Sequence, residues 1–259
     1  MTFQVRVQRI VQETPEVRSF KLAAVADVPL PPFQAGAHID IHLPGGLVRQ
    51  YSLCNGPTEK DAYFIAVKRE QSSRGGSAAM HDLIREGDLL AISEPRNNFL
   101  LSSSAKHHLL LAAGVGITPL LSMARHLVML GATFELHYFA RSSELAAFKS
   151  SLEDPAYTGR VHLHLGLEPL EVQSRLQTIV SERRPGAHLY LCGPAPFMNA
   201  VRRCASSSWP ADSLHFEYFV ADEATLSAPK EAFTVRLANR GGEYEIPSDQ
   251  SIVQVLAGH

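Results

Sequence analysis

The chain has 259 residues, of which 45% are hydrophobic and 19% charged, enough to bury two ordinary cores. Its formal net charge is -2, with 24 basic residues against 26 acidic ones, which excludes the basic face that a nucleic-acid binder needs. No apolar run approaches the ~18 residues of a membrane span, and no charged-then-apolar leader opens the chain. We therefore expect a cytoplasmic protein whose partners include neither nucleic acid nor membrane.

The first part of the chain, up to about residue 100, alternates apolar and polar residues, as in Phe3-Gln-Val-Arg-Val7 and Ile39-Asp-Ile-His-Leu43. This period of two, interrupted by turns rich in proline and glycine, predicts several short antiparallel strands that form a barrel or a sandwich. A helix is expected there only over residues 77–84.

From His107 onward the pattern changes to apolar strands separated by helical stretches. Strands that alternate with helices predict a parallel sheet of the doubly wound type. The boundary between the two parts is expected in residues 95–105, where asparagine, proline and serine cluster. The strands are expected at residues 107–113, 133–140, 161–165, 188–192 and 214–219.

A glycine turn follows the strand expected over 107–113 and precedes a helical stretch, reading Gly114-Val-Gly116-Ile117-Thr118-Pro119. Gly114 and Gly116 allow the backbone to approach a pyrophosphate, Thr118 can cap the helix, and Pro119 suits its first turn. Because Pro119 replaces the third glycine of the dinucleotide fingerprint, an ordinary strand-to-helix turn is the alternative interpretation.

Two segments of the first part have the character of a second anion site. The strand Arg49-Gln50-Tyr51-Ser52-Leu53 places an aromatic ring and a hydroxyl beside an arginine, and Arg74-Gly75-Gly76-Ser77 precedes the helix expected over 77–84. Exposed N–H groups at a helix N-terminus and positive charge suit an anion, although a flexible surface turn is the alternative. Two anion sites in two domains indicate two phosphate-bearing cofactors.

The order of these motifs, ending in Cys192-Gly193-Pro194, resembles the ferredoxin-NADP reductase superfamily. Within it the chain is similar to the group of phthalate dioxygenase reductase and vanillate O-demethylase oxidoreductase. This resemblance implies an FMN-binding antiparallel β-barrel over residues 1–100 and an NAD(P)-binding α/β domain with a doubly wound parallel sheet over residues 105–222. It further implies a β-grasp [2Fe-2S] ferredoxin domain at the C-terminal end.

The same resemblance implies a set of site residues. FMN contacts are implied for Arg49, Gln50, Tyr51, Ser52, Ala66, Lys68, Arg74, Gly75, Gly76, Ser77 and Phe219. NAD(P) contacts are implied for Gly114, Gly116, Ile117, Thr118, Pro119, Arg141, Cys192, Gly193 and Pro194. Catalytic positions are implied for Ser52, near the flavin N5, and for Cys192 and Glu217. Taken by itself, Cys192 has the alternative interpretation of an ordinary buried cysteine.

The nucleotide preference depends on the residues after the second parallel strand, Arg141-Ser-Ser-Glu144. Arg141 could hold a 2′-phosphate, whereas Glu144 could accept from a ribose 2′-hydroxyl. The resemblance favours NADH, with NADPH as the alternative.

The C-terminal stretch, residues 231–259, predicts a hairpin and a short helix beginning at Ser251, too little to bury a core alone. It resembles the beginning of a plant-type ferredoxin domain, in which the cysteines of the cluster follow. The chain's three cysteines, Cys54, Cys192 and Cys204, all lie elsewhere. We therefore expect a truncated [2Fe-2S] domain without its ligands.

Twelve histidines raise the question of a metal site. His162 and His164 share one face of a strand, but no cysteine or pair of acids stands near them in the sequence, and His107 and His108 begin another strand. Because a metal site needs convergent ligands, we interpret these as solvent-facing strand residues and expect no metal ligands.

The expected function is that of an NAD(P)H-oxidising FMN reductase that passes electrons through a [2Fe-2S] centre to a Rieske-type aromatic oxygenase, a dioxygenase or an O-demethylase. Two alternatives remain: a stand-alone flavin reductase, and a non-catalytic redox-sensing subunit on the same scaffold.

Overall fold

A computed structural model describes residues 2–25, 29–71, 75–219, 231–238 and 241–258. The chain divides into two compact units, Met1–Phe219 and Val220–His259. Among the helices of these described residues, none has the length and apolar character needed to cross a bilayer.

The first unit begins with an antiparallel sheet whose strands follow the order β4-β3-β6-β1-β2-β5. An isolated bridge between Leu53, just after β4, and Ile65 of β5 joins the two ends of this order and closes the sheet into a barrel. Inward-facing residues of alternate positions fill the barrel, as the period of two predicted. The strands are β1 (Thr2–Thr14), β2 (Val17–Ala24), β3 (His38–Leu43), β4 (Leu47–Ser52), β5 (Ala62–Lys68) and β6 (Leu89–Ser93), and α1 spans Gly76–Asp82.

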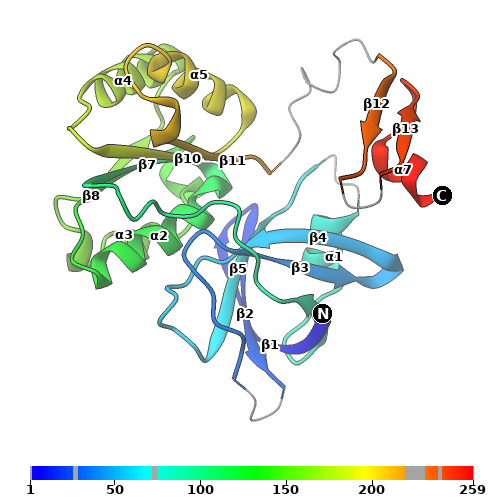
Figure 1. Ribbon diagram of the computed structural model, residues 1–259. Coiled ribbons are helices and arrows are strands. Elements are labelled where there is room, and N and C mark those ends of the chain that lie inside the picture. The colour runs from blue at the N-terminus through cyan, green and yellow to red at the C-terminus, as the bar shows by residue number, and fades with distance from the viewer. Residues whose placement is uncertain (1, 26–28, 72–74, 220–230, 239–240, 259) are drawn as a thin grey trace. The chain divides into compact units, whose positions relative to one another are not determined.

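The second sheet of the same unit is parallel throughout, with the order β11-β10-β7-β8-β9. Figure 1 shows α4 and α5 on one face of this sheet and α2 and α3 on the other, which is the doubly wound arrangement that the sequence predicted. The strands are β7 (His107–Ala113), β8 (Phe134–Ala140), β9 (Val161–Leu165), β10 (Ala187–Cys192) and β11 (Leu214–Glu217). The helices are α2 (Ile117–Met129), α3 (Lys149–Leu152), α4 (Pro169–Ser181) and α5 (Ala195–Ala205).

Helix α2 is buried on nearly every side because it lies between the two sheets. Its apolar residues share one core cluster with Val17, Cys54 and Ala66 from the barrel side. The Ser122 hydroxyl of α2 donates to the carbonyl oxygen of Asn55 at 2.7 Å, and both residues are fully buried. The two sheets therefore share a continuous interior.

The second unit contains the antiparallel hairpin of β12 (Phe233–Arg236) and β13 (Glu243–Ile246), followed by α7 (Ile252–Ala257). Ser251 caps α7, and Gln254 completes the capping box. The hairpin and the helix beginning at Ser251 are as predicted. Phe233 and Val253 are exposed.

Candidate functional site

The ends of strands from both sheets meet at a single contact. Ser52, the last residue of β4, donates its hydroxyl to Glu217 Oε2 at 3.1 Å, and Glu217 is the last residue of β11. In the strand registers, His38 lies opposite Ser52, and Cys192 lies opposite Glu217. His38 Nδ1 stands 4.0 Å from Glu217 Oε1. Two of the residues implied as catalytic, Ser52 and Glu217, are thus in direct contact, with Cys192 on the neighbouring strand.

Burial governs the ionisation of this group. It raises the pKa of Glu217 to about 7, against the opposing effect of the Ser52 hydrogen bond. Burial, together with the charge of Glu217, also raises the pKa of the Cys192 thiol well above its usual value. Burial and the charge of Arg96 lower the pKa of His38. At neutral pH the site therefore contains a thiol, a neutral imidazole and a carboxyl group that readily gains or loses a proton.

The glycine turn before α1 lies against Arg49. Gly75 is the N-cap of α1 with φ 87°, a left-handed conformation that favours glycine. A Cβ on Gly76 would lie 2.4 Å from Arg49 Cγ and Nε, so the arginine side chain crosses the helix start. The structure thereby brings together two segments that were predicted to form one anion site. Ser77 Oγ, at the same place, accepts a hydrogen bond from the Glu70 N–H. Arg74 lies outside the described residues.

The remaining residues implied for FMN in the barrel lie on β4 and β5 and differ in exposure. Tyr51 packs against the barrel core, and burial raises its pKa to about 12. Ala66 is buried, and Lys68 Nζ lies 3.2 Å from Glu70. Gln50 is exposed on β4.

Phe219 departs from the expected strand. The strand predicted over 214–219 ends at Glu217, and Phe219 lies beyond it with 45% of its surface exposed. The main-chain pairing with β10 stops at Cys192, where the partner strand itself ends, so the last two residues have no neighbour for a ladder.

The second glycine turn connects β7 to α2 and packs against β10. Gly114 has φ 55°, and a Cβ there would meet open space. A Cβ on Gly116 would lie 2.3 Å from the backbone oxygen of Cys192. The expectation that Thr118 caps α2 is wrong, because Gly116 is the N-cap and the Thr118 hydroxyl donates to the Val115 oxygen at 3.0 Å. Ile117 already has helical geometry, which places Thr118 and Pro119 within the first turn.

The Cys192-Gly193-Pro194 segment lies beside this turn. A Cβ on Gly193 would come within 2.9 Å of the Ala113 side chain, and Pro194 is the N-cap of α5. Arg141, just after β8, instead reaches Glu16 in the barrel, with Nη2 at 3.2 and 3.3 Å from the two carboxylate oxygens. The residues implied for NAD(P) thus gather at the carboxyl ends of β7 and β10, with Arg141 after the end of β8.

Sequence reasoning missed His38 and Glu16 as neighbours of the expected site residues. The signal for His38 was available, since the turn at Pro44–Gly46 makes β3 and β4 a hairpin and so sets His38 opposite Ser52. No local signal marks Glu16, because its contact with Arg141 spans 125 positions.

One expectation about histidines is wrong. His107 and His108 are buried, because β7 is the central strand and helices cover both faces of the sheet. His162 is exposed on the edge strand as expected, and His164 is half-buried. Sequence reasoning did not place Glu135 and His137 of the neighbouring strand close to them.

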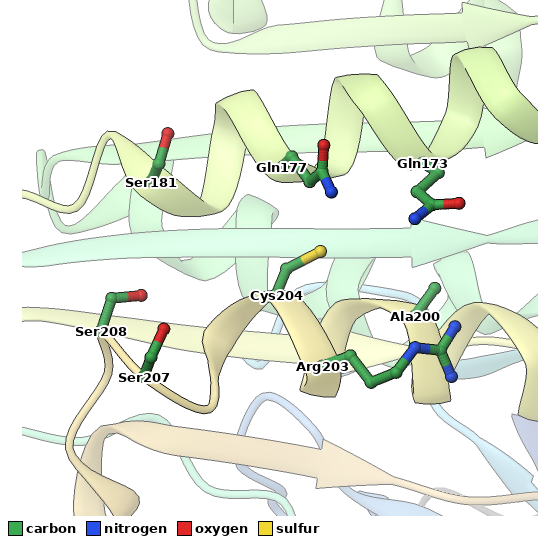
Figure 2. Close-up of a pocket in the computed structure, with 8 residues that line it drawn as sticks. All are labelled: Gln173, Gln177, Ser181, Ala200, Arg203, Cys204, Ser207 and Ser208. Carbon is green, nitrogen blue, oxygen red and sulfur yellow. The ribbon is translucent and has the colours of Figure 1, made fainter.

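A pocket of about 500 Å³ lies apart from these residues, between α4 and α5. Figure 2 shows that its walls are mainly polar side chains from the two helices. They include Gln173, Gln177, Ser181, Arg203, Cys204, Ser207 and Ser208. None of them is a residue implied for flavin or nucleotide, so we do not assign the redox site to this pocket.

A closed antiparallel barrel joined to a doubly wound sheet, with a glycine turn after the first parallel strand, defines the class of NAD-binding oxidoreductases. Comparison agrees, since the model of the oxidoreductase NAD-binding domain family matches residues 110–203. Vanillate O-demethylase oxidoreductase of Pseudomonas putida is 45% identical over 248 residues, which cover 95% of this chain and 78% of that protein. Phthalate dioxygenase reductase of Burkholderia cepacia is 40% identical over 242 residues, covering 93% and 74%.

The same relationship holds for a solved structure. Phthalate dioxygenase reductase, described as a modular structure for electron transfer from pyridine nucleotides to [2Fe-2S], superposes with a TM-score of 0.81. Its sequence is 37% identical, and the match covers 99% of this chain and 80% of that one. The chain belongs to the family of vanillate O-demethylase oxidoreductase and phthalate dioxygenase reductase, within the ferredoxin-NADP reductase superfamily, as the resemblance predicted.

Proposed function

We propose that this chain is the reductase component of an oxygenase system, oxidising NADH through FMN and supplying electrons through a [2Fe-2S] centre to a Rieske-type aromatic oxygenase. The observation that carries the proposal is the hydrogen bond between Ser52 and Glu217. It joins the barrel strand implied for flavin to the edge of the parallel sheet where nucleotides bind in doubly wound folds. A hydride donor and a flavin held at these two places would meet beside Glu217.

The residues present fit FMN at the first glycine turn. There a Cβ on Gly76 would lie 2.4 Å from Arg49 Cγ and Nε as that side chain now stands, so glycine leaves N–H groups and a positive charge side by side. Arg49, Gly75, Gly76 and Ser77 would hold the phosphate, and Tyr51 would lie beside the ring. When bound, FMN supplies the ability to take two electrons from a nicotinamide and to release them one at a time.

The residues of the chain position the reactants and hold a proton. Ser52 and Glu217 present a hydroxyl and a carboxyl group at the place where the two rings would meet, and a carboxyl pKa near 7 permits either protonation state. The Cys192 thiol is buried and uncharged, and it would lie against the bound nicotinamide. The turn at Gly116 packs on the backbone of Cys192 and so fixes this thiol relative to the start of α2, where the pyrophosphate would bind.

The residues present do not fit a [2Fe-2S] cluster, which requires four thiolate ligands in a plant-type ferredoxin. Residues 231–259 contain no cysteine, and Cys54 and Cys192 are buried in the first unit. We therefore derive no electron-transfer step through a cluster held by the residues of this chain.

The same proposal includes NADH as the preferred donor and a cytoplasmic location. Glu16 neutralises Arg141, the charge that a 2′-phosphate would require, and this favours NADH. The three cysteines are free thiols, as is usual in a reducing compartment.

The decisive experiment is to purify the chain, release its flavin by heat and follow NADH-dependent reduction of ferricyanide. We expect yellow protein, FMN in the supernatant and turnover that Glu217→Gln depresses. Colourless protein that takes up no FMN would refute the flavin assignment. Protein that binds FMN and NADH without turnover would instead indicate the redox-sensing alternative. Delivery to an oxygenase is tested separately, by adding a Rieske-type oxygenase and a cysteine-bearing ferredoxin domain.

A further inference from the structure

Three side chains with metal-binding atoms converge on one face of the parallel sheet. Glu135 and His137 lie two positions apart on β8, and His162 is paired directly with His137 on the edge strand β9. One ligand atom from each side chain lies within 4.8 Å of the others. This is the face covered by α4 and α5, whereas Cys192 and Glu217 point to the opposite face because their strand positions have the other parity. The group is therefore separate from the proposed redox site.

His137 has an unused buried nitrogen at the centre of this group. The side chain is 8% exposed, and its Nδ1 lies 3.0 Å from His164 Nε2. Among the described residues, its Nε2 makes no hydrogen bond and faces Glu135 Oε2 at 3.7 Å. In the tautomer in which Nδ1 donates to His164, Nε2 carries a lone pair that faces a carboxylate oxygen. A cation bound between these two atoms would satisfy both of them.

The surroundings orient these atoms as an outer shell does at metal sites. Arg184 donates to Glu135 Oε1, which leaves Oε2 directed at His137. His164, which bonds His137, is itself stacked on Phe139 with ring centroids 4.3 Å apart. Metal-binding histidines are typically held by such a second hydrogen bond.

Room for a water ligand exists beside the group. A cavity of about 90 Å³ is lined by Glu135 and His137, together with His107 and Glu182. This volume exceeds the ~30 Å³ share of a single water molecule. His162 lies on the edge strand, and its ring stacks on that of His137 with centroids 4.6 Å apart, so binding an ion requires the His162 ring to turn until a nitrogen points toward the other two ligands.

We propose that Glu135, His137 and His162 bind a divalent transition-metal ion of the zinc class, with water as the fourth ligand. Two imidazole nitrogens and one carboxylate oxygen are a zinc donor set, and tetrahedral ligands about 2.1 Å from an ion lie roughly 3.4 Å apart, close to the 3.7 Å between Nε2 and Oε2. The bound ion would link the edge strand β9 to β8, the strand that ends immediately before Arg141.

The test uses the full chain, without an affinity tag, loaded with FMN and stripped of metals by a chelator. Zn²⁺ alone is titrated in a calorimeter, and Co²⁺ alone is followed by its visible absorption. We expect one ion per chain, a Kd on the order of 1 µM, and a tetrahedral Co²⁺ spectrum without thiolate charge-transfer bands. His162→Gln and Glu135→Gln should each weaken binding at least about tenfold, and His164→Gln, through its bond to His137, by ~10-fold.

The matched control is His215→Gln, which removes a histidine from the stacked pair with His188, on the other face of the sheet. We expect this variant to bind Zn²⁺ as the parent does. His162 lies on the edge strand, so its variant should retain FMN and its melting temperature, which separates lost ligation from lost folding. Absence of binding below about 100 µM, equal binding by His162→Gln and the parent, or a thiolate spectrum would each overturn the proposal.

Discussion

The two glycine turns of the first unit differ in what each missing side chain faces. At Gly76 the nearest atoms belong to the flexible side chain of Arg49, whereas at Gly116 they belong to the backbone of Cys192. The Arg49 side chain can move aside. The backbone of Cys192, at the end of the interior strand β10, can move only if the sheet moves with it. The turn before α1 is thus adaptable, and the turn before α2 is rigid.

The largest effect is expected at the rigid turn. In Gly116→Ala the new Cβ would stand 2.3 Å from the Cys192 oxygen, so β10 and α2 must separate. We expect NADH-dependent turnover to fall at least ~100-fold, or about 2.7 kcal/mol of barrier, and the free energy of unfolding to fall by ~1–3 kcal/mol. Steady-state kinetics measure the turnover, and urea unfolding measures the free energy of unfolding. The control is Gly131→Ala, with φ 63° but open space, where only the backbone cost of ~1 kcal/mol should appear. Equal activity in the two variants would contradict the rigid turn.

The next effect concerns Glu217, which lies between the two turns. Glu217→Gln should reduce turnover by about 10- to 100-fold, because the amide cannot exchange a proton. Burial raises the folded pKa of Glu217 from 4.5 to about 7, so its ionisation opposes folding, and its contribution to native stability falls as the pH rises from about 4.5 to 7. The loss is on the order of 3 kcal/mol and should be missing in the variant. Urea unfolding at pH 5 and pH 8 tests this, with Glu182→Gln as the control. The buried histidines, whose pKa values are lowered, act in the opposite direction in both chains, so the test is the difference in unfolding free energy between parent and variant. A difference of the same size at both pH values would refute the assignment.

A smaller effect is expected at the adaptable turn. In Gly76→Ala the Arg49 side chain must leave its place across the helix start, and we expect FMN to bind about tenfold more weakly while NADH affinity is retained. Fluorescence titration of the flavin-free chain measures this change. Gly45→Ala, which has open space around it but a positive φ that Gly76 does not have, is the control for a glycine substitution away from Arg49. A loss of FMN affinity as large as the loss of turnover in Gly116→Ala would remove the distinction between the turns.

The smallest effect is expected at Arg141, which is exposed and paired with Glu16. Arg141→Ala should lower kcat/KM for NADPH about threefold relative to NADH, since exposed ion pairs contribute little. Glu16→Gln frees the arginine and should shift the ratio of the two donors the opposite way. The measurement is kcat/KM with NADH and with NADPH for each variant. If the ratio of the two values is unchanged in both variants, Arg141 does not contact the ribose.

Much of the fold follows from local patterns. The strands predicted at 107–113 and 161–165 coincide with β7 and β9. The first is buried and mostly apolar, as is usual for a parallel strand covered on both faces, whereas the second alternates apolar and polar residues on the edge strand. Strand ends were less predictable, as Phe219 shows, because pairing stops where the neighbouring strand stops.

The residues of the candidate site were predictable mainly by resemblance. Neither the bond from Ser52 to Glu217 nor the nearness of Glu135 to His162 can be read locally, since both require the register of paired strands. At Thr118 a local signal was present but misleading. Threonine does favour helix caps, but α2 begins earlier, with Gly116 as its N-cap.

The burial of α2 between the two sheets has a consequence for engineering. A chimera that exchanges residues 110–203 for those of a relative would replace one half of a shared interior, including Ser122, while Asn55 and Val17 stay behind. Donor specificity is therefore better transplanted through the exposed loop after β8 than by exchanging the domain. Split versions of the protein, cut between the sheets, should be recovered as soluble material only when both halves are expressed together.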